Sequence, residues 1–317
     1  MPVADPSQLD LRPYQHGDEA RIIDLFEQSF GSAIAPEFWR WRYLDHPAGG
    51  PLIELAWDGD RLAAHYAVSH APLTIDGEPT AASLSMTTMT HPDYRGMGLF
   101  PSLAERLYAR LGEMGHALVH GFPNVMSHST FAKSLGWQDV RPLPMLAVAP
   151  SKARGCSLEP KVRRVDVIDD AFADLLGALP VRTGIRRSRD AELMRWRIDA
   201  NPQHSYERWL LMEGGEAAAY AIAKAFGDGA LDLVEIDGEP AAVAALIGHV
   251  VADAAGRQIS AVSTWCSLGD PMHASFERKG FTMAAPVTYH GGRAFREGDD
   301  LFDPRRWSVS MLDSDLF

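Results

Sequence analysis

The sequence predicts an α/β protein made of two similar halves. The first observation is a run between residues 83 and 115 that reads as a strand, a glycine-bearing loop and a helix. The second is a set of sequence matches that recur in the same order in both halves. The third is the succession of short apolar strands and amphipathic helices in the first half, which is typical of α/β proteins.

The elements of the first half can be placed one after another. A short strand at 9–12 precedes an amphipathic helix at 18–30, whose apolar residues fall on one face, and a second helix is expected at 36–44. The remaining elements are strands at 52–57, 62–70 and 82–90, the helix after the glycine loop, a strand at 117–122 and a helix at 125–135.

The glycine loop has the features of an anion site. Gly96 and Gly98 carry no Cβ, so the backbone can approach a phosphate closely. Pro101 suits the first turn of the following helix, whose unpaired N–H groups and dipole attract negative charge. Gly115 is expected to end this helix in a left-handed conformation. The segment therefore predicts a phosphate-binding loop.

The same loop resembles a known signature. Arg95-Gly96-Met97-Gly98-Leu99-Phe100 is similar to the Arg/Gln-x-x-Gly-x-Gly/Ala motif of the GNAT acyltransferases (GCN5-related N-acetyltransferases), with Phe100 in place of Gly or Ala. The runs His91–Gly96, Gly121–Asn124 and Phe131–Trp137 resemble neighbouring parts of that family. The alternative is a turn whose glycines only make room. It accounts for the glycines but for neither Arg95 nor the downstream run.

The resemblance implies a fold and a cofactor. The fold would be a mixed, mostly antiparallel sheet flanked by helices, and acetyl-CoA would be the co-substrate. Pantetheine would lie between the strands at 82–90 and 117–122, and a backbone N–H near Met89 would stabilise the oxyanion. The cofactor-binding residues that the resemblance implies are Met89, Thr90, Arg95, Gly96, Met97, Gly98, Leu99, Phe100 and Asn124.

The acid that protonates the CoA thiolate is not at its usual place. Where GNAT enzymes usually carry a tyrosine stands Phe131, which has no proton to give. His128, one turn earlier, is the candidate, because the pKa of a histidine is readily tuned; Ser127 and Ser129 are substitutes. The alternative is that His128 caps its helix or faces solvent.

The general base also has several candidates. The strand at 82–90 holds no Asp or Glu, so His120 on the neighbouring strand is one choice. The terminal carboxylate of Phe317 is another, because an acidic tail with an aromatic end resembles families whose terminal carboxylate reaches the active site. The alternative is a frayed acidic tail. Three further side chains remain open as bases: Glu54, Asp45 and His46.

The second half repeats the first without its glycine loop. The matched runs are 38–47 with 193–202, which share Arg-Trp-Arg and a following Pro, 58–67 with 213–221, and 131–137 with 276–281. At the place of the loop stands 235–240, with one glycine and three carboxylates that disfavour a pyrophosphate.

We therefore expect two tandem GNAT-like domains. Residues 1–150 would bind acyl-CoA, and residues 151–317 would be a degenerate copy that lacks the pyrophosphate loop. Pro, Gly, Ser and basic residues collect between 142 and 161, which is typical of a linker.

Composition limits the partners. The 317-residue chain has a net charge of −12, which disfavours nucleic acid and suits either a cationic amine substrate or solubility alone. Cys156 and Cys266 fit a reducing cytoplasm, and no His/Cys spacing predicts a metal. The sequence holds no apolar run of about eighteen residues and no signal peptide, so we expect no membrane partner.

The sequence thus predicts a cytoplasmic N-acetyltransferase. It would move an acetyl or other acyl group from acetyl-CoA to a primary amine of a small molecule by direct attack. One alternative is a non-catalytic acyl-CoA-binding or regulatory protein, motivated by the missing tyrosine. Another is an aminoacyl transferase of the peptidoglycan-building type, which the acidic charge opposes. Assembly as a homo-oligomer is left open.

Overall fold

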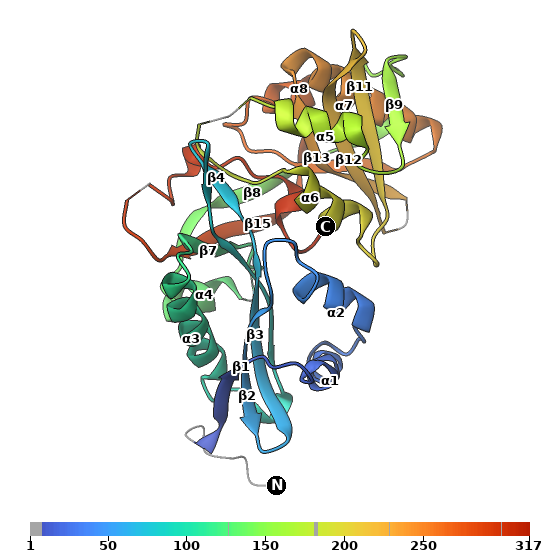
Figure 1. Cartoon of the computed structure of the whole chain (residues 1–317). Helices are drawn as coiled ribbons and strands as arrows, with labels where there is room; N and C mark the ends of the chain where they lie inside the picture. The colour runs from blue at the N-terminus through green and yellow to red at the C-terminus, as the bar shows by residue number, and fades with distance from the viewer. Residues whose placement is uncertain (1–7, 126, 181–182, 228, 299) are drawn as a thin grey trace. The chain divides into compact units, whose positions relative to one another are not determined.

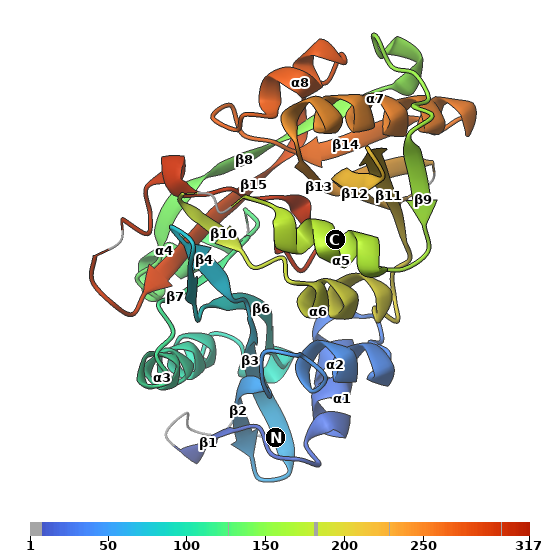
Figure 2. The ribbon, with the colours of Figure 1, turned by 45° about the horizontal axis from the view of Figure 1, so that its top comes forward.

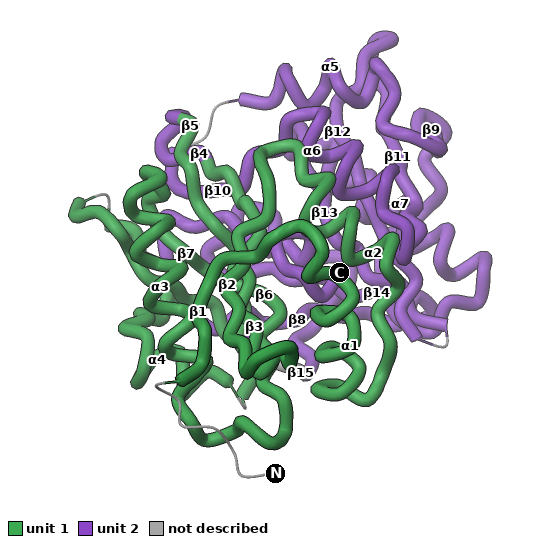
Figure 3. Tube along the Cα trace, turned by 60° about the horizontal axis from the view of Figure 1, so that its bottom comes forward, with its two compact units in different colours: residues 1–73, 79–140, 289–302 green, residues 74–78, 141–288, 303–317 purple. Residues whose placement is uncertain are grey.

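The computed structural model describes residues 8–125, 127–180, 183–227, 229–298 and 300–317, with the backbone alone for Pro286 and Val287. The chain forms two compact units that interleave along the sequence (Figure 3). Unit 1 contains residues 1–73, 79–140 and 289–302, and unit 2 contains residues 74–78, 141–288 and 303–317. The division at 150/151 treated the halves as contiguous segments, whereas each unit draws on separate stretches of the chain.

Unit 1 is built on a mixed sheet in the order β1-β2-β3-β6-β7-β15. Neighbouring strands are antiparallel, except that β6 and β7 are parallel. The bounds are β1 Asp10–Pro13, β2 Leu52–Asp58, β3 Arg61–His70, β6 Ser83–Thr90, β7 Leu118–Gly121 and β15 Thr282–Ala294, of which residues 289–294 belong to unit 1.

Helices cover both faces of the unit 1 sheet (Figure 1). Tyr66 of β3 packs in the core with the α3 side chains, while Ala67 packs with those of α1 and α2. The faces therefore alternate along the strand, as a buried strand requires. The bounds are α1 Glu19–Phe30, α2 Pro36–Tyr43, the 3-10 turn η2 Pro92–Tyr94, α3 Leu99–Glu113 and α4 His128–Ser134.

Unit 2 contains a second sheet region in the order β8-β14-β13-β12-β11-β9, in which β13 and β14 are parallel. Helices α7 and α5 cover its opposite faces (Figure 2), because Ala221 of β12 packs in the core with α7 whereas the ring of Tyr220 packs against Phe172 of α5. The strand bounds are β8 Gln138–Val148, β9 Val162–Val165, β11 Tyr206–Glu213, β12 Glu216–Phe226, β13 Ala230–Gly238 and β14 Ala261–Trp265.

The other helices and strands complete the chain. The helices are α5 Asp170–Ala178, α6 Ala191–Met194, the π-helical turn η4 Arg195–Asp199, α7 Pro240–Gly256, α8 His273–Arg278, and the 3-10 turns η3 Pro150–Lys152, η5 Pro304–Arg306 and η6 Met311–Asp313. The short strands are β4 Leu73–Ile75, β5 Glu78–Thr80 and β10 Ile185–Arg187.

The two units share one order of strand pairing. In unit 1, β2, β3 and β6 pair antiparallel in sequence, and α3 then leads to the parallel strand β7. In unit 2, β11, β12 and β13 pair in the same way, and α7 leads to the parallel strand β14. The repeat in the sequence therefore has a counterpart in the topology, while duplication of one ancestral domain stays a prediction.

Two sequence expectations need correction. The first part of the expected linker at 142–161, residues 142–148, belongs to strand β8. Its ladder with β14 covers Met145–Val148 and so lies beyond Pro142 and Pro144, which lack a donor N–H. The expected loop at 235–240 is also largely strand, because β13 continues to Gly238 and α7 begins at Pro240.

Candidate functional site

The glycine loop joins η2 to the N-terminus of α3. Gly98 is the N-cap of α3 with a φ of 73°, and Gly96 has a φ of 78°. Glycine adopts this left-handed region without the steric cost of a Cβ. No side chain caps the helix, so its first N–H groups stay available. A Cβ placed on either glycine would meet nothing within 4 Å, which shows open space beside the loop.

Phe100 departs from the motif but has a defined place. Its ring packs against Tyr66 and Phe131, with centroid distances of 5.4 Å to each. The ring is thus held against the core on the α3 side of the sheet. This packing explains how a large residue is accommodated in the first turn of α3. Leu99 beside it is buried, while Arg95 is exposed and Met97 half-buried.

Strands β6 and β7 part close to this loop. Their parallel ladder covers two residue pairs, Ser83 with Val119 and Leu84 with His120. None of the described residues pairs with the later part of β6, 85–90, on the β7 side, so this part of the strand presents a free edge there. Gly121 directly follows the last paired residue of β7, His120. A Cβ at Gly121 would lie 3.1 Å from Trp137 Cη2 and 3.4 Å from the Ser85 carbonyl oxygen, so the backbone is closely surrounded there.

The other predicted cofactor residues surround this edge. Met89 is buried in the core beneath α1 and α2, and Thr90 is half-buried at the end of β6. Asn124 is exposed and lies in the turn before α4: its carbonyl accepts the N–H groups of Ser127 and His128, and its Oδ1 accepts the N–H of Ser127 at 3.1 Å.

His128 forms a dyad with Asp139. Its Nε2 lies 2.7 Å from Asp139 Oδ1, and its ring stacks on Tyr289 at a centroid distance of 4.1 Å. The side chain is 25% exposed, and no side chain caps α4. The alternative of a helix cap is therefore wrong, whereas the ring still faces solvent in part. Sequence reasoning missed Asp139 and Tyr289, because Tyr289 joins this unit from a distant part of the chain.

His120 is enclosed. It is 1% exposed, and its ring meets the edges of His290 and Phe122 at centroid distances of 5.6 and 6.0 Å. Gly292 lies opposite it on β15, where a Cβ would come within 3.1 Å of the His120 Cα. Aromatic side chains and neighbouring backbone thus enclose His120.

The other three candidates for the general base have structural partners. Glu54 is buried and accepts hydrogen bonds from Arg110 at 2.8 Å and Arg106 at 3.2 Å, both on α3. Asp45 lies 3.5 Å from Arg40, and the Nδ1 of His46 accepts the N–H of Ala48. Glu54 therefore ties α3 to β2, a role that its candidacy as base did not anticipate.

The tail of the chain is packed into unit 2. Phe317 is 8% exposed, and its ring stands perpendicular to Trp265 at 5.2 Å, with Lys224 Nζ 5.4 Å from its centroid. Arg197 donates a hydrogen bond to the Phe317 carbonyl. Ser310 and Asp313 form a capping box in the preceding turn. The alternative of a frayed tail is therefore wrong, and each of these contacts lies within unit 2.

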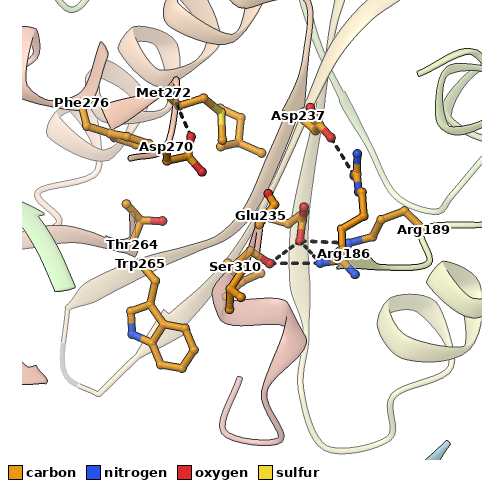
Figure 4. Close-up of a pocket in the computed structure, with 14 residues that line it drawn as sticks. Arg186, Arg189, Glu235, Asp237, Thr264, Trp265, Asp270, Met272, Phe276 and Ser310 are labelled. Carbon is orange, nitrogen blue, oxygen red and sulfur yellow. Dashed lines mark hydrogen bonds and ion pairs between the residues drawn. The ribbon is translucent and has the colours of Figure 1, made fainter. Parts of the chain in front are cut away.

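The place in unit 2 that corresponds to the parted strands is filled with charged side chains (Figure 4). Strands β13 and β14 pair up to Asp232 and Ser263, and a narrow cleft with a free volume of about 30 Å³ lies beyond. Arg189 binds Glu235 at 2.7 Å and Asp313 at 2.6 Å within it. Burial raises the pKa of Glu235, and Arg189 opposes that rise. Because residues 308–310 also line this cleft, the chain itself occupies much of it.

Within the described ranges, no group of three or more His, Cys, Asp or Glu side chains is placed to hold a metal. A helix long and apolar enough to cross a membrane is likewise absent from that part of the chain.

Comparisons with known proteins show what the chain is similar to. The family model of the acetyltransferase (GNAT) domain matches residues 10–140. A search of curated proteins gave no match. Among solved structures, the chain is similar to a probable N-acyltransferase of unknown function from Enterococcus faecalis, with 12% identity, coverage of 91% of this chain and 72% of the other, and a TM-score of 0.75.

Two further structures are similar over the same extent. They are GCN5-related N-acetyltransferases from Anabaena variabilis (13% identity, 91% and 73% coverage, TM-score 0.71) and from Kribbella flavida (18% identity, 90% and 71% coverage, TM-score 0.69). At these identities the likeness shows the fold. The predicted mixed α/β fold, with a mainly antiparallel sheet flanked by helices, is confirmed.

Proposed function

We propose that this acyltransferase, whose residues 10–140 match the acetyltransferase (GNAT) domain, moves an acetyl or related acyl group from acetyl-CoA to the primary amine of a small molecule. The observation that carries the proposal is the uncapped N-terminus of α3 behind Gly96 and Gly98, next to the edge of β6 that has no strand partner. N–H groups arranged in this way bind phosphate oxygens.

The proposal assigns a role to each part of this surface. The pyrophosphate would bind the loop from Arg95 to Phe100, with the exposed Arg95 adding a positive charge. Pantetheine would run along the edge of β6, past Met89 and Thr90, towards Asn124. An N–H near Met89 would polarise the acyl carbonyl, because a preorganised donor there stabilises the developing oxyanion.

Direct attack needs two proton transfers. The amine nitrogen forms a bond to the acyl carbon, loses one proton, and expels the CoA sulfur as the C–S bond breaks. His128 is the proposed donor of a proton to that sulfur, and Asp139 holds its ring in place. His120 and the Phe317 carboxylate remain the proposed bases.

The rest of the chain would serve the acceptor. We propose that unit 2 is a degenerate copy that does not bind CoA, because its own charged side chains lie in the corresponding cleft. The net charge of −12 favours a cationic acceptor through long-range attraction. A cytoplasmic site of action goes with this proposal, because the cytoplasm supplies acetyl-CoA.

Calorimetric titration with acetyl-CoA tests the cofactor site. The informative pair of variants is Gly98→Glu and Gly115→Glu, at opposite ends of α3. Both glycines have a left-handed φ, 73° and 80°, and a Cβ on either would meet no atom within 4 Å, so the steric and conformational costs match. We expect Gly98→Glu to abolish binding, because the new carboxylate repels the pyrophosphate. Gly115→Glu should bind like the wild type.

Equal affinity in both variants would contradict the proposed loop. A panel of primary amines, with release of free CoA as the readout, then tests the chemistry. Tight binding without CoA release from any amine would favour a non-catalytic acyl-CoA-binding protein.

A further inference from the structure

Strand β6 contains a bulge with an unusual backbone. The ladder between β3 and β6 pairs Tyr66 with Thr88 and Ala67 with Met86, which leaves Thr87 as an extra residue. Thr87 has a φ of 37°. A β-branched residue rarely adopts a positive φ, because its side chain crowds the backbone there. This conformation therefore needs support from its surroundings.

His65 supplies a contact at this bulge. It lies on β3, is 1% exposed, and its Nδ1 is 3.0 Å from the Thr87 carbonyl oxygen. Because a carbonyl only accepts hydrogen bonds, Nδ1 carries the proton and donates it. Burial lowers the pKa of His65 to about 4, so the ring is neutral at pH 7. Among the described residues, none offers a hydrogen bond to its Nε2.

The bulge decides which way the end of β6 faces. Residues three apart on a regular strand point to opposite faces. Met86 and Met89 are three apart, yet both pack in the core beneath α1 and α2. The extra residue has therefore changed the alternation. The extra residue also shifts the alternation of the backbone N–H groups. The bulge therefore sets which N–H groups of Thr88–Thr90 point to the β7 side of β6, where the ladder has ended.

Unit 2 contains a bulge whose extra residue does not have a positive φ. The ladder between β12 and β13 pairs Ile222 with Glu235 and Ala223 with Leu233, so Val234 is extra. Val234 is not among the described residues with a positive φ. Counted from the turns at Gly59 and Gly214, the residue in the place of His65 is Tyr220, whose buried hydroxyl has no hydrogen-bond partner among the described residues.

We propose that His65 is a positioning residue for acyl transfer: its Nδ1–H holds the Thr87 carbonyl and fixes the left-handed bulge that aims the backbone of Thr88–Thr90 at the acyl group. The inference rests on the proposed function and gives it a residue that the sequence had not singled out. The bulge with a positive φ and a histidine contact occurs in the unit that has the glycine loop. For the bulge at Val234, in the unit without that loop, the described residues show neither a positive φ nor a histidine contact.

Two variants of nearly equal shape test the contact. Asn and Leu have similar size, but His65→Asn keeps an N–H close to the position of Nδ1, whereas His65→Leu removes the donor. With the amine that releases CoA fastest, we expect His65→Leu to lower kcat about 100-fold, as a misplaced reacting group does. The affinity for acetyl-CoA should stay unchanged. His65→Asn should recover most of the loss.

A control and a second variant separate positioning from folding. His116→Leu removes another buried histidine of unit 1, which contacts Ser83 rather than Thr87, and should leave kcat unchanged. In the His65→Leu background, Thr87→Gly should restore much of kcat, because glycine adopts a positive φ without support. An unaltered kcat in His65→Leu, or an equal loss in His65→Asn and His65→Leu, would overturn the proposal.

Nitrogen-15 NMR of the histidine rings gives a readout that needs no turnover. We expect His65 to be the neutral tautomer with the proton on Nδ1 between pH 5 and 8. A proton on Nε2 would overturn the proposal. Wild-type protein that neither binds acetyl-CoA nor releases CoA would instead overturn the proposed function, and the role of His65 would fall with it. The two failures are therefore distinguishable.

Discussion

At the scale of single residues, one histidine is set apart by its partners. His128 is fixed from two sides, by the Asp139 carboxylate at 2.7 Å and by the stacked ring of Tyr289. A surface histidine without a role has no need of such restraint, because ordering a side chain costs conformational entropy. A restrained imidazole suits a group that must meet a leaving thiolate at a fixed position.

The first prediction concerns this dyad. His128→Gln should lower kcat about 100-fold or more, because it removes the proposed proton donor to sulfur. Asp139→Asn should have a smaller effect, because the imidazole itself remains and loses only the carboxylate that fixes it. The measurement is steady-state CoA release, with circular dichroism to confirm folding. Larger damage from Asp139→Asn than from His128→Gln would contradict the assignment.

The buried His65 predicts how stability depends on pH. Its pKa is about 4 in the folded protein and about 6.5 in an unfolded chain. Between these values the unfolded chain binds one more proton, so stability is complete above pH 6.5 and falls as the pH drops towards 4. From pH 7 to pH 5 the wild type should lose about 2 kcal/mol more than His65→Asn. Urea unfolding at both pH values measures this; equal losses would contradict a buried neutral ring.

At the scale of elements, local sequence patterns were enough to predict most helices and strands of the first half. The strand at 82–90 and the helix ended by Gly115 are confirmed as β6 and α3, since Gly115 has a φ of 80° directly after the helix. Glycine positions and apolar spacing are local signals, and these elements depend on them. The bulge at Thr87 was not predicted, because nothing in the Thr-Thr run marks a positive φ. One signal was available: His65 lies in the run Leu62–Val68, whose other residues are aliphatic or aromatic.

Long-range pairing accounts for what the sequence did not reveal. Residues 291–294 pair with β7, and β8 continues through Pro142 and Pro144, although neither stretch carries a signal for its partner. The candidate site shows the same division. The glycines of the loop were predictable from spacing, whereas Asp139 and Tyr289 reach His128 through strand order, which a single sequence does not encode locally.

The C-terminal tail gives a prediction at this scale. Phe317→Ala should lower the free energy of unfolding by about 3 kcal/mol, because the buried ring against Trp265 is lost. The variant keeps a terminal carboxylate, so kcat in the folded protein should persist whether or not that carboxylate is the base. Extension by one glycine moves the carboxylate instead. Reduced kcat in the extended chain, with stability retained, would support the catalytic role, and full turnover would remove it.

At the scale of the whole molecule, the interleaved units determine how the chain can be divided. Unit 1 needs residues 289–302, whose strand pairs with β7 and whose Arg293 lies beside Glu105 of α3. Unit 2 needs residues 141–148 of β8, of which 145–148 pair with β14. A chain cut at 150/151 therefore leaves each half without a strand that its own unit requires.

The last prediction follows from this interleaving. Residues 1–150 expressed alone should unfold readily and bind acetyl-CoA poorly, because β7 exposes an unpaired edge and the glycine loop loses its supporting sheet. Residues 151–317 alone should likewise lack the edge partner of β14. Co-expression of both fragments should restore a cooperative unfolding transition and cofactor binding, since the broken chain can still supply every strand. Calorimetry and thermal unfolding of the fragments, separately and together, measure this. A stable isolated 1–150 fragment with wild-type affinity would show that the first half folds as a contiguous domain after all.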